Sequence, residues 1–353
     1  MGSILGVVLH AIGGFAAGSF YIPVKKIQGW KWESAWFILG STAWLLTPVI
    51  MVFLTVRNPF AVIENTPSVA FGYVYLFGLL WGIGGLTFGL SMRYLGISLG
   101  MTVALGLCTA FGTLIPPFFN GKSSILFNSG QGLTTLFGIL LCLIGIGVVG
   151  YAGMLKEKER NAEKKSSIIE EFDFKKGIMV AFISGILSAC FAFGLEAGKD
   201  ISALTSSLGT QELFKNNMVL MYILWGGMTT NGLYSLYLNF RHRSYGNYSD
   251  KKLPLKWNYF WAMLGGLTWY LQFFFYGMGT TFIGHEFEFA SWSIHMSFII
   301  LFSNLWGIYF HEWKGISRKT ASILMMGLLI VFVSILMIGM ATNISEFLTH
   351  LLS

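Results

Sequence analysis

The chain has 353 residues, of which 54% are hydrophobic and 11% are charged, and its mean hydropathy is +0.65. Soluble domains carry about 25% charged residues, so this composition excludes an ordinary soluble globular protein and predicts a protein embedded in a lipid bilayer. The formal net charge of +7 does not indicate nucleic-acid binding, because the basic residues form short clusters between apolar runs and no basic face with interleaved aromatic residues.

Apolar runs recur along the whole chain, and each is long enough for a membrane-spanning helix, which needs about 20 residues. The sequence predicts ten spans, at 3–23, 33–56, 71–92, 98–118, 133–153, 177–197, 217–240, 257–278, 288–310 and 320–342. The predicted fold class is therefore an all-α membrane protein with ten transmembrane helices. Its widest gap, at 156–176, is charged, and we expect it to be a cytoplasmic linker.

The distribution of basic residues predicts the orientation of these spans. An even number of spans places both termini on one side of the membrane. If that side is outside the cytoplasm, the cytoplasmic loops hold 19 of the 23 Lys and Arg residues, and the outer side keeps Arg57, Lys122, Lys199 and Lys215. Lys and Arg are enriched in cytoplasmic loops, so we expect both termini to lie outside.

Two pairs of segments suggest an internal repeat. GVVLHAIGGFAAGSF (6–20) is similar to GIMVAFISGILSACF (177–191), and Gly84-Gly85-Leu86-Thr87 recurs as Gly265-Gly266-Leu267-Thr268. These matches place span one on span six and span three on span eight, so the repeat has five helices and its halves are inverted. Inverted repeats are typical of secondary transporters. Chance similarity between Gly-rich apolar helices is the alternative. The predicted parts are a first repeat at 1–155, a linker at 156–176 and a second repeat at 177–353.

The ninth predicted span carries ionisable residues, which are costly in lipid and usually face a cavity or a partner. Glu288, Ser291, Trp292 and His295 follow i, i+3, i+4, i+7 spacing, so we expect them on one helix face. At 1.5 Å per residue, His295 would lie about 10 Å below Glu288.

A histidine in the first span completes the candidate proton site. His10 enters from the same side as His295, so the two should lie at similar depth. Histidine titrates near neutrality and a desolvated carboxyl can approach it, so Glu288, His295 and Glu286 are our candidates for proton coupling. The alternative is structural, with each histidine hydrogen-bonded to a backbone carbonyl.

The eighth predicted span carries a candidate sugar site. Trp269, Gln272 and Tyr276 lie at i, i+3 and i+7 on one face. Aromatic rings suit the C–H faces of a sugar, and an amide offers fixed hydrogen bonds to its hydroxyls. We predict substrate contacts from this face and from Ser291, Trp292 and His10. Packing alone is the alternative for the aromatic residues.

Enzymatic chemistry is not indicated. His285-Glu286 and His311-Glu312 begin like a zinc-protease motif, but neither has a second histidine at the required spacing. We therefore expect no enzyme, no metal and no cofactor.

Four segments resemble a known family. FYIPVKKIQGWKWE (20–33), MRYLGISLG (92–100), WYLQFFFYGMG (269–279) and ASWSIHMSF (290–298), together with His10, resemble the L-rhamnose–proton symporter family of the drug/metabolite transporter superfamily. The likeness covers essentially the whole chain. The resemblance implies uptake of a deoxy sugar with protons across the bacterial inner membrane.

Individual positions follow or depart from the family pattern. The matching positions are Lys25, Lys26, Arg93, Gln272, Trp292 and His295. In the departures, Glu196 and Glu286 replace amides, and Glu288 replaces a shorter acid. The expected partners are a small sugar, protons and the lipid bilayer. The competing hypotheses are an exporter or exchanger of another small metabolite, and a non-transporting membrane receptor or enzyme.

Overall fold

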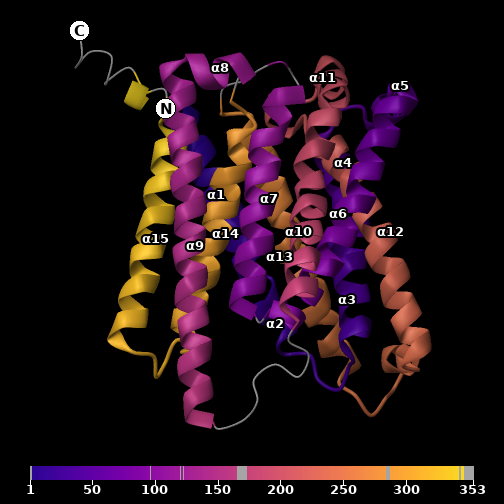
Figure 1. Cartoon of the computed structure of the whole chain (residues 1–353). Coiled ribbons are helices and arrows are strands. Elements are labelled where there is room, and N and C mark those ends of the chain that lie inside the picture. Colours follow the sequence, from indigo (N-terminus) through magenta and orange to yellow (C-terminus); the bar gives the residue numbers. More distant parts are fainter. Residues whose placement is uncertain are drawn as a thin grey trace.

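Long helices run side by side through the molecule, and short helices lie at its two ends (Figure 1). Every regular element in the described residues is helical. The computed structural model describes residues 2–95, 97–119, 121, 123–164, 173–283, 287–341 and 343–345.

Each predicted span falls on a long helix or on a continuous run of helices. The long helices are α1 (Gly2–Ser19), α6 (Ser68–Leu95), α7 (Ile97–Phe119), α9 (Gly130–Lys164), α10 (Phe174–Ala197), α12 (Asn217–Arg241), α13 (Leu255–Thr280), α14 (Ala290–Tyr309) and α15 (Arg318–Gly339). The predicted second span is a run of α3 (Trp32–Gly40), a π-helical segment η1 (Ser41–Leu46) and α4 (Thr47–Thr55). The short elements are α2 (Tyr21–Val24), α5 (Pro59–Asn65), α8 (Ser123–Asn128), α11 (Lys199–Ser207), η2 (Glu212–Phe214) and η3 (Ser244–Tyr248).

Seven helical stretches among the described residues are long and apolar enough to cross a membrane, which makes this a multi-pass membrane protein. They are Ile4–Val24, Trp32–Thr55, Ser68–Leu95, Gly100–Phe118, Gly130–Glu159, Phe174–Ser207 and Arg318–Gly339. The other three predicted spans fall on α12, α13 and α14. These three are helical throughout but are less apolar, because they carry Asn, Gln or His together with Trp and Tyr. The number ten therefore stays a prediction.

The predicted linker begins as a continuation of a helix. α9 runs on to Lys164, past the boundary expected at residue 155. The added segment, KEKERNAEK, consists largely of good helix formers, so it extends the helix beyond the apolar run.

The two ends of the bundle carry different elements. α1 begins and α15 ends at the end that also carries α8 and α11, which we call the upper end (Figure 1). The opposite, lower end carries α2 and the C-terminal end of α9 (Figure 1).

The helices pair closely across the two halves of the sequence. α1 contacts α13 and α14, while α10 contacts α6 and α7; α9 pairs with α15. Glycines permit one of these contacts and another between α13 and α2. A Cβ at Gly84 of α6 would lie 2.5 Å from the backbone nitrogen of Ser188 in α10. A Cβ at Gly265 of α13 would lie 2.9 Å from the side chain of Val24 in α2, so larger residues would separate both pairs.

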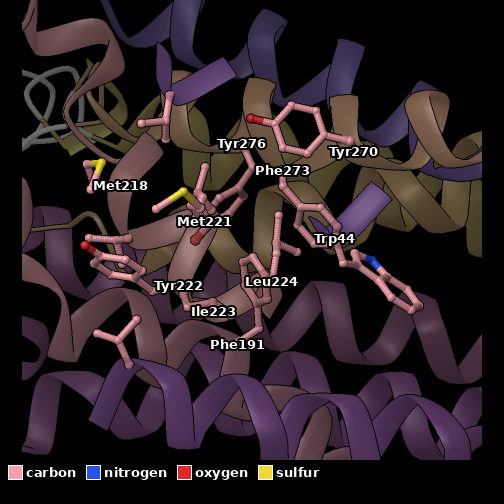
Figure 2. Close-up of a cluster of buried hydrophobic side chains, with 14 of the residues drawn as sticks. Trp44, Phe191, Met218, Met221, Tyr222, Ile223, Leu224, Tyr270, Phe273 and Tyr276 are labelled. Carbon is pink, nitrogen blue, oxygen red and sulfur yellow. The ribbon is translucent and has the colours of Figure 1, made fainter. Parts of the chain in front are cut away.

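The largest buried cluster lies between α12, α13, α10 and the run from η1 to α4. Figure 2 shows its centre, where Phe273 and Tyr276 of α13 lie near Phe191 of α10 and near Leu224 of α12. Trp44 reaches this cluster from η1 (Figure 2). The aromatic centre of the bundle is the place where the candidate site lies.

Candidate functional site

A cavity of about 130 Å³, here the central cavity, lies at this aromatic centre. Its walls come from α6, α10, α13 and α14. The lining residues are Trp81, Phe191, Trp269, Gln272, Phe273, Tyr276, Trp292, His295, Met296 and Ile299. Five of them, Trp269, Gln272, Tyr276, Trp292 and His295, were predicted as site residues, so the consecutive helices α13 and α14 bring the two predicted groups together.

The chemistry of the central cavity is aromatic and neutral polar. Its described lining contains no Asp, Glu, Lys or Arg. Gln272 is 6% exposed and supplies an amide from the middle of α13. Fixed amide and imidazole groups beside flat rings can bind hydroxyls and C–H faces at once, which is what recognition of a neutral polyol requires.

Ring contacts hold the aromatic walls in place. Phe191 stacks on Phe273 with ring centroids 4.8 Å apart, and on Trp292 at 5.7 Å. Trp269 stacks on Phe20 at 4.3 Å and meets Trp44 edge-on at 5.0 Å. Offset and edge-on pairs of this kind are favourable and directional, so the cavity walls are preorganised.

The two histidines lie together, as the depth argument predicts. The ring centroids of His10 and His295 are 6.0 Å apart, and Tyr276 touches both rings, at 5.3 Å and 5.1 Å. His295 lines the central cavity, whereas His10 is fully buried behind it and does not line the cavity.

Several polar atoms around this pair are buried without a hydrogen-bond partner among the described residues. They are both ring nitrogens of His10, Nδ1 of His295 and Oγ of Ser291. Buried polar atoms are nearly always paired, so a group of unpaired ones beside a cavity indicates a place for water, a proton or a ligand.

A second cavity, of about 320 Å³, lies towards the upper end, and we call it the upper cavity. Tyr276 and Trp292 line both this cavity and the central one, so they form the wall between them. Unlike the central cavity, the upper one has Glu and Lys side chains in its lining, namely Glu196, Lys199, Lys215 and Glu288.

Short-range ion pairs organise the mouth of the upper cavity. Lys199 pairs with Glu196 one turn earlier, as expected from their spacing, and Lys215 pairs with Glu212 at 3.0 Å. The Glu196–Lys199 pair is partly exposed, so its charges remain hydrated.

Glu288 is placed differently from the prediction. α14 begins at Ala290, so Glu288 lies in the turn before the helix, where its backbone carbonyl accepts a hydrogen bond from the amide of Ser291 at 3.0 Å. Its side chain lines the upper cavity, while His295 lines the central one. Ser291 is buried and lines neither of these two cavities, and Glu286 lies outside the described residues.

Trp292 is fixed in the wall by α7. Its indole N–H donates to the backbone carbonyl of Cys108 at 3.1 Å. The indole also lies against Gly112, where a Cβ would overlap the ring. A glycine at this position therefore allows the wall to close.

Five lining residues escaped the sequence analysis: Trp81, Phe191, Phe273, Met296 and Ile299. A signal existed for one of them, because Phe191 ends the segment that matches 6–20. The predicted repeat matches α10 with α1 and α6 with α13, and α1 and α13 already carried candidate residues.

A multi-pass helical protein with an uncharged, aromatic cavity enclosed between its helices has the architecture of a small-molecule transporter. The chain belongs to the L-rhamnose-proton symport protein (RhaT) family, whose profile matches residues 2–343. This confirms the resemblance to that family and makes the chain a transporter and not an enzyme.

Curated relatives cover almost the whole chain. An L-rhamnose-proton symporter of Cronobacter sakazakii is 35% identical over 344 residues, which are 96% of this chain and 98% of the relative. Proteins with the same name from Yersinia pestis and Yersinia pseudotuberculosis are 34% identical over 340 residues, which cover 96% of this chain and 97% of each relative.

Proposed function

We propose that this chain imports L-rhamnose, or a closely related sugar, together with protons across the bacterial inner membrane by alternating access. The observation that carries this proposal is the neutral, aromatic central cavity beside a histidine pair, in a chain whose relatives are named L-rhamnose-proton symporters. A neutral sugar needs no counter-charge, and the cavity offers none.

The sugar binds in the central cavity, with Gln272 and His295 as hydrogen-bonding partners and Trp269, Tyr276 and Trp292 as aromatic walls. At about 130 Å³ the cavity is smaller than the roughly 300–1,000 Å³ of ordinary ligand pockets. Sugar entry therefore requires Tyr276 and Trp292 to move apart, which joins the central cavity to the upper one. His10 and Ser291 line neither the central nor the upper cavity, and their polar side-chain atoms do not contact the sugar in the closed state.

The proton is carried by the group formed by Glu288, Tyr276 and the histidine pair. Glu288 lines the water-accessible upper cavity, and Tyr276 lies between that cavity and both histidines. A carboxyl that loses water when the upper cavity closes behind the bound sugar favours its neutral, protonated form, so closure and proton uptake support each other. Glu286, in the segment before α14, remains a second candidate.

The architecture we propose is ten spans in two inverted five-helix repeats, 1–155 and 177–353. The helix pairings support it. In the two repeats α1 corresponds to α10, α13 to α6 and α14 to α7. The contacts of α1 with α13 and α14 therefore correspond to those of α10 with α6 and α7. Gly84 and Gly265, which match in sequence, both lie where a helix comes close, Gly84 against Ser188 of α10 and Gly265 against Val24 of α2.

Both termini then lie in the periplasm, with the upper end of the bundle. A reporter active only in the cytoplasm should be silent when fused after Ser353 and active when inserted near Ala162. The reverse pattern would overturn this orientation.

Transport is tested with purified protein in proteoliposomes. An imposed inward proton gradient should drive accumulation of labelled L-rhamnose, and a proton ionophore should abolish it. Downhill exchange without gradient-driven accumulation would favour the exchanger hypothesis. Absence of sugar binding and of flux would favour a receptor or another substrate. A binding screen of pentoses and hexoses would then identify the ligand.

A further inference from the structure

A third cavity lies towards the lower end, between α7, α9 and α14, and none of the predicted site residues lines it. Its volume is about 300 Å³, which reaches the range of ordinary ligand pockets, unlike that of the central cavity. We call it the lower cavity.

One face of α14 connects all three cavities. Trp292 lines the upper and central cavities, Ile299 lines the central and lower cavities, and Ser303 lines the lower one. These positions are seven and four residues apart, which keeps them on one side of a helix. From Trp292 to Ser303 the helix rises about 16 Å. Ile299 therefore lies between the central and lower cavities, just as Trp292 lies between the upper and central cavities.

The lower cavity is lined largely by apolar residues and glycines, and three neutral polar side chains among them can hydrogen-bond to a polyol. Ser303 and Asn304 supply a hydroxyl and an amide from α14, and Thr102 supplies a hydroxyl from α7. The amide nitrogen of Asn304 donates to the carbonyl of Ile300 at 2.9 Å, which leaves the amide oxygen as an acceptor.

The lower rim of this cavity carries charged side chains, and each of them contacts a neighbouring residue. Glu312 lines the cavity and forms an ion pair with Lys25 of α2's C-terminal end at 3.5 Å. Lys156 of α9 lies over the ring of Trp313, 4.2 Å from its centroid. Neutral polar side chains in the wall and charged side chains at the rim give the cavity hydrogen-bonding partners for a polyol and a polar opening.

We propose that the lower cavity is a second sugar-binding position, occupied by the sugar after it passes Ile299 and before it leaves the protein. This inference rests on the proposed function, because it assigns a further position to the same sugar. Ser303 and Asn304 are its hydrogen-bonding residues, and Ile299 is the side chain that separates it from the central cavity.

The test uses a cysteine reporter in the full chain. Ser303→Cys is reconstituted, and its alkylation by a membrane-impermeant maleimide added on the lower side is followed with and without L-rhamnose. The native cysteines are buried, and mass spectrometry identifies the modified residue. The sugar concentration that halves the labelling rate is the half-protecting concentration. At about ten times this concentration, bound L-rhamnose should slow the labelling of Ser303→Cys about tenfold by mass action. Asn304→Cys is the second reporter if Ser303→Cys does not fold.

A matched control separates occupancy from a change of conformation. Ile308→Cys lies on the same helix at the same end but is 39% exposed and does not line the cavity, so its labelling should not respond to sugar. Adding Asn304→Ala to Ser303→Cys should raise the half-protecting concentration roughly fivefold, because a hydrogen bond of about 1 kcal/mol is lost.

Two results would overturn the inference. One is equal labelling of Ser303→Cys with and without saturating sugar. The other is protection that Asn304→Ala leaves unchanged, because the sugar would then act from a distance. Gradient-driven accumulation of L-rhamnose is measured in the same vesicles. If accumulation persists while protection is absent, only the lower site fails; if wild-type protein does not accumulate sugar, the proposed function fails.

Discussion

The central and upper cavities share Tyr276 and Trp292 as walls, yet their chemistry differs. The upper cavity is lined by two Glu and two Lys side chains, whereas the described lining of the central cavity has no Asp, Glu, Lys or Arg. Burial of an unpaired charge is costly, so charge is kept where water reaches it and neutral recognition is placed in the dry centre. The comparison suggests that proton uptake begins in one cavity and sugar binding occurs in the other.

The strongest test of this division between the two cavities is Glu288→Gln. The substitution keeps the shape of a protonated acid and removes the group that can bind and release a proton. We expect the variant to bind and exchange sugar, yet to lose all accumulation against a gradient, and its sugar binding to lose pH dependence. Uptake in proteoliposomes and binding titrations between acidic and neutral pH measure both effects.

Glu196→Gln is the matched control for Glu288→Gln, since Glu196 lines the same cavity and forms an ion pair with Lys199. It should still accumulate sugar. If Glu288→Gln concentrates sugar with protons as well as wild type does, Glu288 is not the carrier, and His295→Gln and His10→Gln are tested next.

The wall between the two cavities is tested by Gly112→Ala. The added methyl group would overlap the indole of Trp292 and strain its hydrogen bond to Cys108. Overpacking of this kind costs about 1–3 kcal/mol, and we expect sugar affinity to fall by the upper part of that range. Gly147→Ala is the control, because a Cβ there meets no described atom within 4 Å. Equal sugar affinities of Gly112→Ala and Gly147→Ala would mean that the position of Trp292 does not matter for sugar binding.

Gln272→Ala tests sugar recognition in the central cavity separately from proton coupling. Loss of the amide leaves sugar hydroxyls without a partner, so affinity should fall by roughly 1–3 kcal/mol while proton-gradient dependence is retained. Isothermal titration gives the affinity, and a thermal unfolding curve shows that the variant is folded. A folded variant with unchanged affinity would make Gln272 a packing residue.

The sequence predicts much of the helical framework because apolar runs of about 20 residues have few alternatives to a membrane-spanning helix. It also predicts the faces of α13 and α14 that meet in the central cavity, because spacing along one helix determines which side chains share a face. Family resemblance alone implied the substrate, since neither composition nor spacing distinguishes one neutral sugar from another.

Other features depend on contacts that no local pattern encodes. Glu288 precedes α14 by two residues, and the boundary of a helix is poorly defined by an apolar run. The separation of Glu288 from His295 depends on Trp292, whose position is determined by a glycine on α7 that is distant in sequence. Phe191 and Trp81 reach the cavity from α10 and α6, and only the tertiary arrangement shows that these helices face α13.

The smallest effect is expected at the mouth of the upper cavity. Lys199→Met breaks the ion pair with Glu196, in which the lysine side chain is 42% exposed. An exposed pair contributes about 0–1 kcal/mol, and salt weakens it further. Because a neutral sugar gains little from this charge, affinity should change by less than about threefold, and accumulation should persist at low and high ionic strength. A large, salt-sensitive loss of affinity in Lys199→Met would mean that the sugar is recognised among the charges of the upper cavity, and the division of labour between the two cavities would have to be abandoned.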